Sequence, residues 1–102
     1  MKKLYFILLF FTGFLITAQQ LRSHEEIEGF KLYPNPTVNN KVYIETADNA
    51  PKQIHVFDVI GTPVHQTTLV GRELNLGHLD RGVYIVRVTE RDRRVTRKLV
   101  IK

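Results

Sequence analysis

Residues 79–88 read Leu-Asp-Arg-Gly-Val-Tyr-Ile-Val-Arg-Val, and residues 95–101 read Val-Thr-Arg-Lys-Leu-Val-Ile. Both stretches are rich in β-branched and aromatic residues and alternate in character, a pattern typical of half-buried β-strands. The polar residues 90–94 between them predict a turn, so residues 83–101 are expected to form an antiparallel hairpin. The chain stops at Lys102, directly after the second strand, so we expect this hairpin to function as a C-terminal element of the protein.

Shorter stretches of the same kind precede this hairpin. No segment after the first eighteen residues shows an apolar period of 3.6 that would indicate a helix. About seven short strands, separated by turn residues every eight to twelve positions, predict an all-β fold, an antiparallel β-sandwich. The five earlier strands are expected at residues 30–33, 42–45, 53–59, 64–70 and 72–76.

The first residues have the pattern of a secretory signal peptide. Lys2 and Lys3 precede an apolar run at 4–16, and Ala18 provides a small residue before a cleavage point. The run is shorter than the ~18–20 residues needed to cross a membrane, although an uncleaved anchor is the alternative. We therefore expect a cleaved signal peptide at 1–18, a flexible polar leader at 19–29, a folded domain at 30–102 and no membrane span in the mature chain.

Composition sets limits on how this domain is stabilised and on what it binds. The chain contains no cysteine, so an apolar core must stabilise the fold without disulfides. Without residues 1–18, 13 basic residues oppose 10 acidic ones, a net charge of +3. Much of the excess lies in the last hairpin, at Arg91, Arg93 and Arg94. A nucleic-acid partner is not expected, because the leader predicts export and no base-stacking motif is present.

Catalytic residues are scarce. Ser23, in the leader, is the one serine after residue 18, and no threonine has a neighbouring pattern that would activate its hydroxyl. Asp58, Asp80 and Asp92 fall at turns, where aspartate commonly bonds to nearby backbone. We therefore expect no enzyme and no cofactor.

Four histidines raise the possibility of a metal site. His55 and His65 could approach each other across a hairpin, whereas His24 and His78 lie elsewhere in the sequence. Period-two alternation, however, directs both rings away from the apolar face and toward solvent. A site with two histidines and no third ligand would also be weak, so no metal site is predicted.

Four segments resemble, in order, the motifs of the type A C-terminal sorting domain of the type IX secretion system, the Por secretion system family of Bacteroidetes-type bacteria. They match a Tyr-Pro-Asn-Pro element, an Asp-x-x-Gly turn, a Leu-x-x-Gly-x-Tyr element and a terminal strand. The residues are Tyr33, Pro34, Asn35 and Pro36; Asp58 and Gly61; Leu79, Gly82 and Tyr84; and Lys98, Leu99, Val100, Ile101 and Lys102. The two prolines also place residues 33–36 at a sheet edge or at a kink between two sheets.

The resemblance implies an immunoglobulin-like β-sandwich that is not an enzyme. Such a domain would reach the periplasm through the Sec pathway and direct export through the outer-membrane translocon to the cell surface or the medium. A gingipain-like sortase would remove it, and the cargo could be attached to anionic surface lipopolysaccharide. We expect the terminal strand, at Lys98–Lys102, to carry unpaired backbone groups that a receptor reads by strand addition.

The family's domain normally follows a large cargo, whereas about eleven residues separate the predicted cleavage point from this one. The chain is therefore expected to be either a remnant or fragment, or a domain that acts alone. A different function is also open: a small secreted adhesion or binding module that meets its partner through the basic hairpin.

Overall fold

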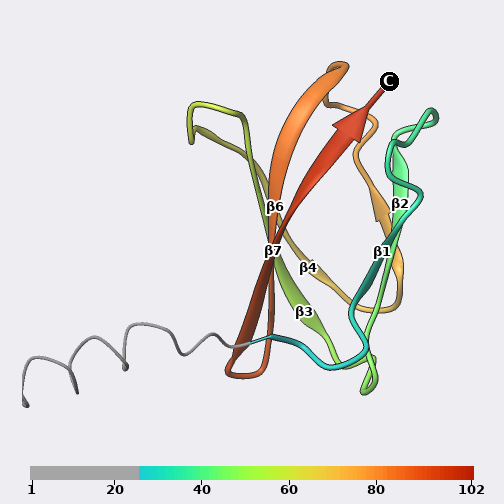
Figure 1. The fold of residues 1–102 in the computed structure, drawn as a ribbon, viewed down its shortest axis with the longest axis vertical. Coiled ribbons are helices and arrows are strands. Elements are labelled where there is room, and N and C mark those ends of the chain that lie inside the picture. The colour runs from blue at the N-terminus through green and yellow to red at the C-terminus, as the bar shows by residue number, and fades with distance from the viewer. Residues whose placement is uncertain (1–25) are drawn as a thin grey trace, which may run out of the picture.

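The computed structural model describes residues 26–102, and these form two antiparallel sheets packed face to face (Figure 1). One sheet has the strand order β1-β2-β5 and the other β4-β3-β6-β7. The strands are β1 (Lys31–Tyr33), β2 (Lys41–Glu45), β3 (Lys52–Phe57), β4 (Pro63–Leu69), β5 (Glu73–Asn75), β6 (Gly82–Glu90) and β7 (Arg93–Ile101). The prediction of an all-β sandwich of seven strands is confirmed. The expected signal peptide and the leader as far as residue 25 lie outside the described residues.

The closing hairpin is longer than expected. The β6–β7 register runs from Gly82 opposite Ile101 to Glu90 opposite Arg93, which leaves a two-residue turn. Arg91, the first residue of that turn, has a φ of 56°. The expected five-residue turn at 90–94 is therefore wrong, because the strand pairing continues through polar residues that the composition assigned to a loop.

Alternation supplies the core. Every second residue of β2, β3 and β6 points between the sheets and the intervening residues face outward, and β7 contributes Val95, Leu99 and Ile101 in the same way. Burial of these aliphatic side chains drives the two sheets together. The core consists of Ile27, Val42, Ile44, Ile54, Val56, Leu69, Leu74, Leu76, Tyr84, Val86, Val88, Val95, Leu99 and Ile101.

The packed domain begins earlier than residue 30. Ile27 is only 4% exposed and belongs to the core. The Glu28 carbonyl accepts a bond from the Ala47 N–H at 2.9 Å, and the Phe30 N–H donates to the Ile27 carbonyl. The expectation that a flexible leader extends to residue 29 is thus wrong for its last residues, since one apolar side chain in a polar stretch is enough to anchor it.

A β-bulge overturns the expectation for His65. Val56 lies opposite His65 but Phe57 lies opposite Pro63, so β4 carries one extra residue. His65 stays in phase with Thr67 and Leu69 and so shares the face of buried Val56, while the extra residue, Val64, also packs against the core instead of alternating with His65. His65 is half-buried, and burial first, then the charge of His78, lowers its pKa.

His55 keeps the outward phase but is not fully solvated. Its ring stacks on that of Phe57, with centroids 6.5 Å apart. Its Nδ1 is buried and, within the part of the chain that the structure describes, has no hydrogen-bond partner. The approach of His55 to His65 that a hairpin could allow does not occur, because Gln66 lies opposite His55.

Chain reversals collect at the two ends of the sandwich (Figure 1). We call one the Lys102 end; it holds the connections 34–40, 58–62 and 76–81 and the end of β7. We call the other the Glu90 end; it holds the connections 46–51 and 70–72 and the β6–β7 turn.

Candidate functional site

The outer edge of β7 is occupied by a side chain from the proline-rich segment. β7 is the last strand of its sheet, so its outer backbone groups need other partners. Asn35 supplies two of them: its Nδ2 donates to the Lys98 carbonyl at 2.7 Å, and its Oδ1 accepts from the Val100 N–H at 3.0 Å. The Asn35 amide thus takes the place of a neighbouring peptide group.

Thr37 continues the same edge with its backbone. Its N–H donates to the Val100 carbonyl and its carbonyl accepts from the Lys102 N–H, both at 2.9 Å. These bonds form a short parallel bridge between Thr37 and Ile101. Thr37 is fully buried, and its hydroxyl donates to the Lys41 carbonyl at 2.8 Å.

The edge at Lys98–Lys102 is therefore closed. Lys98 accepts, Val100 donates and accepts, and Lys102 donates, so the expected unpaired groups of the terminal strand are not there. The expectation was wrong because sequence patterning shows which residues form an edge strand but not which distant loop covers it.

The two prolines carry the chain from one sheet to the other. β1 belongs to the three-stranded sheet, whereas Thr37 is bridged to β7 of the four-stranded sheet. Pro34 and Pro36, both preceded by cis peptide bonds, lie between these points and need no hydrogen-bond partner for a backbone N–H. The prediction of a kink between two sheets is confirmed.

Tyr33 marks the start of this crossing. It is 41% exposed and stacks on Tyr43 of the adjacent strand, with ring centroids 5.6 Å apart. Its hydroxyl donates to Glu45 Oε2 at 3.0 Å, and that hydrogen bond is the main reason why the pKa of Tyr33 is raised. Tyr33 therefore belongs to the outer face of the sheet and not to the edge contact that Asn35 makes.

Tyr84 joins the corner before β6 to the core. Its ring is 9% exposed, and its hydroxyl donates to the Asp80 carbonyl at 2.7 Å. A tyrosine near the start of a strand that bonds back to the preceding corner is the tyrosine corner of immunoglobulin-like sandwiches. Gly82, two residues earlier, has a φ of +157°, which side-chain-bearing residues rarely adopt. Leu79 is half-buried, and its carbonyl accepts from Asn40 Nδ2 at 2.9 Å.

Asp58 organises the turn between β3 and β4. Its Oδ1 accepts from the N–H groups of Ile60 at 3.1 Å and Thr62 at 2.9 Å. Its backbone N–H donates to the Thr62 carbonyl, and its carbonyl accepts from the Gly61 N–H. Gly61 has a φ of +88°, the left-handed region that glycine adopts without strain. The turn presents Ile60 at its tip, 84% exposed.

These four segments, distant in the sequence, lie together at or beside the Lys102 end. Asn35 and Thr37 contact the end of β7, Gly82 lies opposite Ile101, and the Asp58 turn extends β3 beyond the pairing of Phe57 with Ile85. The Tyr33 side chain lies on the outer surface of the three-stranded sheet, whereas Leu99 is buried in the core. The segments therefore share one end of the molecule but do not line a single cleft.

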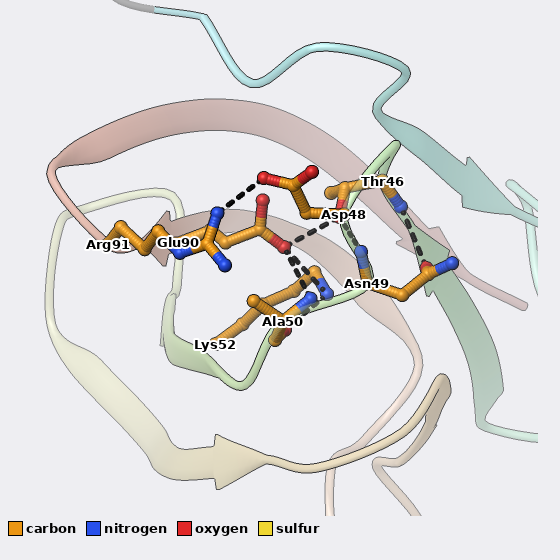
Figure 2. Close-up of polar contacts among 7 residues, drawn as sticks. All are labelled: Thr46, Asp48, Asn49, Ala50, Lys52, Glu90 and Arg91. Atoms are coloured by element: carbon orange, nitrogen blue, oxygen red, sulfur yellow. Dashed lines mark hydrogen bonds and ion pairs between the residues drawn. The ribbon is translucent and has the colours of Figure 1, made fainter.

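A second polar cluster, at the Glu90 end, was not predicted (Figure 2). Glu90 is 6% exposed, and its Oε2 lies 3.1 Å from Lys52 Nζ. The same oxygen accepts from the Thr46 hydroxyl at 2.6 Å and the Ala50 N–H at 3.1 Å, while Lys52 Nζ donates to the Ala50 carbonyl at 2.7 Å. The buried ion pair thus joins β3 and β6 to the end of β2 in the opposite sheet.

Electrostatics at Glu90 favour the charged form. Desolvation, the largest single effect, raises the pKa of Glu90, but hydrogen bonds from Thr46 and Lys52, the charge of Lys52 and the Ala50 N–H together lower it overall. The sequence carried a signal for this pair, since Lys52 and Glu90 are in phase with the buried residues of their strands.

The basic hairpin is partly neutralised by nearby acidic and carbonyl groups. Arg91 pairs with Asp48, with both side chains more than half exposed. Arg97 contacts Glu26 Oε2 at 3.2 Å and lies over the Phe30 ring, 5.2 Å from its centroid. Arg93 donates to the Glu26 carbonyl at 3.3 Å. Exposed pairs of this kind contribute little to stability.

Residues 26–102 contain no group of three or more histidine, cysteine, aspartate or glutamate side chains arranged to hold a metal ion. In the same residues no helix has the length and apolar character needed to cross a membrane.

Strand order, the tyrosine corner and the covered last strand define a small immunoglobulin-like β-sandwich whose motif residues gather at one end. The model of the secretion system C-terminal sorting domain family matches residues 31–102. The chain belongs to this family, which confirms the resemblance to sorting domains of the type IX secretion system. Membership indicates a sorting signal for export to the cell surface or the medium. No curated protein sequence matches the chain closely enough for comparison.

Proposed function

We propose that the type IX translocon recognises the assembled Lys102 end of this sandwich and exports the polypeptide that carries it. The observation that supports this most directly is the contact of Asn35 and Thr37 with β7, because it joins the first and last motif segments into one surface. A receptor that binds there reads a folded arrangement and not a linear tail.

The closed edge shapes the mode of recognition that we propose. Strand addition needs unpaired N–H and C=O groups, and those at Lys98, Val100 and Lys102 are already bonded. Exposed side chains remain for contact, among them Lys98, Lys102 and the proline rings of 34 and 36. Breaking the bonds between Asn35 and β7 would therefore remove part of the surface that the receptor binds, and would not expose a hidden recognition strand.

In this proposal the other steps of export are those of the sorting-domain family. Residues 1–18 act as a Sec signal peptide, residues 30–102 act as the sorting domain, and a gingipain-like sortase acts at the cell surface. Attachment to anionic lipopolysaccharide is then one fate of the exported chain, and release is the other. The proposed role is that of a non-catalytic signal.

An export assay tests the proposal. Residues 26–102 fused behind a periplasmic reporter should bring the reporter to the surface or the medium, and deletion of Lys98–Lys102 should leave it in the periplasm. Asn35→Ala should reduce export severalfold, because the last strand loses two bonds to its edge partner. Asn49→Ala, which removes a hydrogen-bonding asparagine from the Glu90 end, serves as the matched control.

Two results would contradict this proposal. Full export of the truncated fusion would show that the terminal strand is not read. Equal export by folded Asn35→Ala and Asn49→Ala fusions would show that the receptor does not bind the Lys102 end in preference to the Glu90 end. Circular dichroism on each purified fusion domain separates loss of recognition from loss of folding.

The adhesion module remains the second candidate. It requires a basic surface that is free to meet an anionic partner, yet Arg91 and Arg93 already contact Asp48 and Glu26. Charge reversal at Arg91, Arg93 and Arg94 distinguishes the two functions, because it should abolish partner capture by an adhesin and leave reporter export by a sorting domain intact.

A further inference from the structure

Two histidines from distant parts of the chain meet at the Lys102 end. The rings of His65 and His78 have centroids 4.5 Å apart and planes tilted by 60°. The β3–β4 register places His65 on the inner face of the sheet, opposite buried Val56 and next to the β4 bulge. His78 comes from the connection between β5 and β6.

The segment that carries His78 is held in place on both sides. Asn40 Nδ2 donates to the carbonyls of Leu76 at 3.1 Å and Leu79 at 2.9 Å. The Leu79 N–H donates to the Leu76 carbonyl, and the Gly77 N–H donates to Asn75 Oδ1 at 2.9 Å. The backbone on either side of His78 is therefore fixed before any ligand arrives, which reduces the entropic cost of binding.

The ring separation is short enough for one ion to bind both imidazoles. With a metal–nitrogen distance of about 2.1 Å, the metal lies about 3.2 Å from each imidazole centroid. Two such rings at a 90° angle have centroids about 4.5 Å apart, whereas the tetrahedral angle separates them by about 5.2 Å. The observed centroid separation of 4.5 Å brings the two rings near enough to occupy adjacent positions of a square-planar or tetragonal ion.

Both rings are free to ligate. In residues 26–102 the two imidazoles lie against each other, and no third histidine, cysteine or carboxylate completes a cluster with them. The lone pair of a neutral imidazole is the ligand. A bound ion would take its other ligands from water.

We propose that His65 and His78 form a binding site for Cu²⁺, with two imidazole nitrogens in adjacent equatorial positions and water in the others. Cu²⁺ fits because it favours tetragonal coordination by nitrogen and oxygen and binds such ligands more strongly than the other divalent first-row metals. The site is separate from export and does not depend on the proposed sorting function. Its effect on the protein would be to link the edge of β4 to the β5–β6 connection.

Copper titration of the purified chain tests this site. One equivalent of CuCl₂ should give an electron paramagnetic resonance spectrum of a tetragonal ion with splitting from two nitrogens. His78→Ala, an exposed position whose removal leaves the corner bonds in place, should weaken binding at least tenfold. His65→Ala should do the same, while His55→Ala and His24→Ala should bind as the wild type does.

Thermal unfolding gives a second readout. Cu²⁺ should raise the Tm of the wild type and leave that of His78→Ala unchanged, because only the intact pair joins the two segments. Zn²⁺ should bind more weakly than Cu²⁺, and a reversed order would overturn the geometric argument. Copper binding that survives in His78→Ala or disappears in His24→Ala would place the ion elsewhere and overturn the proposal.

Discussion

The two ends of the sandwich are held together by different interactions. At the Lys102 end, side chains bond to backbone: Asn35 to Lys98 and Val100, Tyr84 to Asp80, and Asp58 to its own turn. At the Glu90 end, a buried ion pair joins Lys52 of β3 to Glu90 of β6 within one sheet, and the Glu90 carboxylate accepts a bond from Thr46 at the end of β2 in the other sheet (Figure 2). The family motifs lie at the first end, and the buried charges lie at the second.

The difference shows why one end can be read from sequence. A side chain that bonds to nearby backbone, such as Asp58 or Tyr84, does not depend on which residue supplies the peptide group, so its own position in the sequence marks the contact. An ion pair needs two particular residues at once, and Lys52 and Glu90 come from different parts of the chain. Motif residues thus mark the Lys102 end, whereas the only sequence signal for the Glu90 end is the phase of Lys52 and Glu90 within their buried strands.

The largest expected effect lies at the Lys102 end. Tyr84→Ala should lower the free energy of unfolding by about 3–5 kcal/mol, because a ring that is 9% exposed leaves a cavity in the core. Tyr84→Phe removes only the bond to the Asp80 carbonyl and should cost about 1 kcal/mol. Urea unfolding monitored by circular dichroism measures both. A Tyr84→Ala protein as stable as the wild type would show that the ring does not support this end.

A similar substitution at the Glu90 end should cost slightly less. Glu90→Gln leaves the Lys52 ammonium buried without a counter-charge, and breaking a buried pair in this way costs about 3 kcal/mol. Asp48→Asn, which breaks the exposed pair with Arg91, is the matched control and should cost at most about 0.5 kcal/mol. Equal losses in the two variants would mean that burial does not distinguish these pairs.

Acidification should weaken the Glu90 end first. The folded-state pKa of Glu90 is lowered, so its contribution to stability is present above the unfolded-state value of about 4.3 and is lost as the pH falls through the folded-state pKa. The free energy of unfolding, measured by urea titration between pH 7 and pH 2.5, should fall in the wild type. Glu90→Gln should show a smaller fall over the same range. Parallel pH profiles would exclude Glu90 as a source of acid sensitivity.

Alternation and turn chemistry predicted the architecture well. The period-two pattern of residues 83–88 predicted a half-buried strand, which the structure confirms, and Asp58 with Gly61 predicted a turn that the structure also confirms. These signals are local, because a strand's phase and a turn's φ requirement depend on a few adjacent residues. The export function came from the motif order and is supported at the level of the family.

Local sequence patterns failed to predict side-chain orientation where one extra residue interrupted the strand alternation, and they failed to predict contacts made by segments distant in the sequence. The β4 bulge broke the alternation between Val64 and His65, so that both lie toward the core, and no pattern in residues 63–69 marks it. Ile27 packs into the core from a stretch that is otherwise polar. The closure of β7 depends on Asn35, a contact between residues that lie far apart in the sequence and become neighbours only after both sheets form.

The smallest expected effect comes from Asp58, and it bears most directly on what a receptor reads. Asp58→Ala removes the acceptor of two N–H groups in an exposed turn where water can replace it, so the loss should be about 1 kcal/mol. Asp58→Asn keeps an oxygen in the same place and should lose less. Thermal unfolding measures stability, and the reporter fusion measures export. If Asp58→Ala stays folded but exports poorly while Asp58→Asn exports normally, the receptor contacts the turn that presents Ile60. If both export normally, recognition is confined to the Asn35–β7 edge.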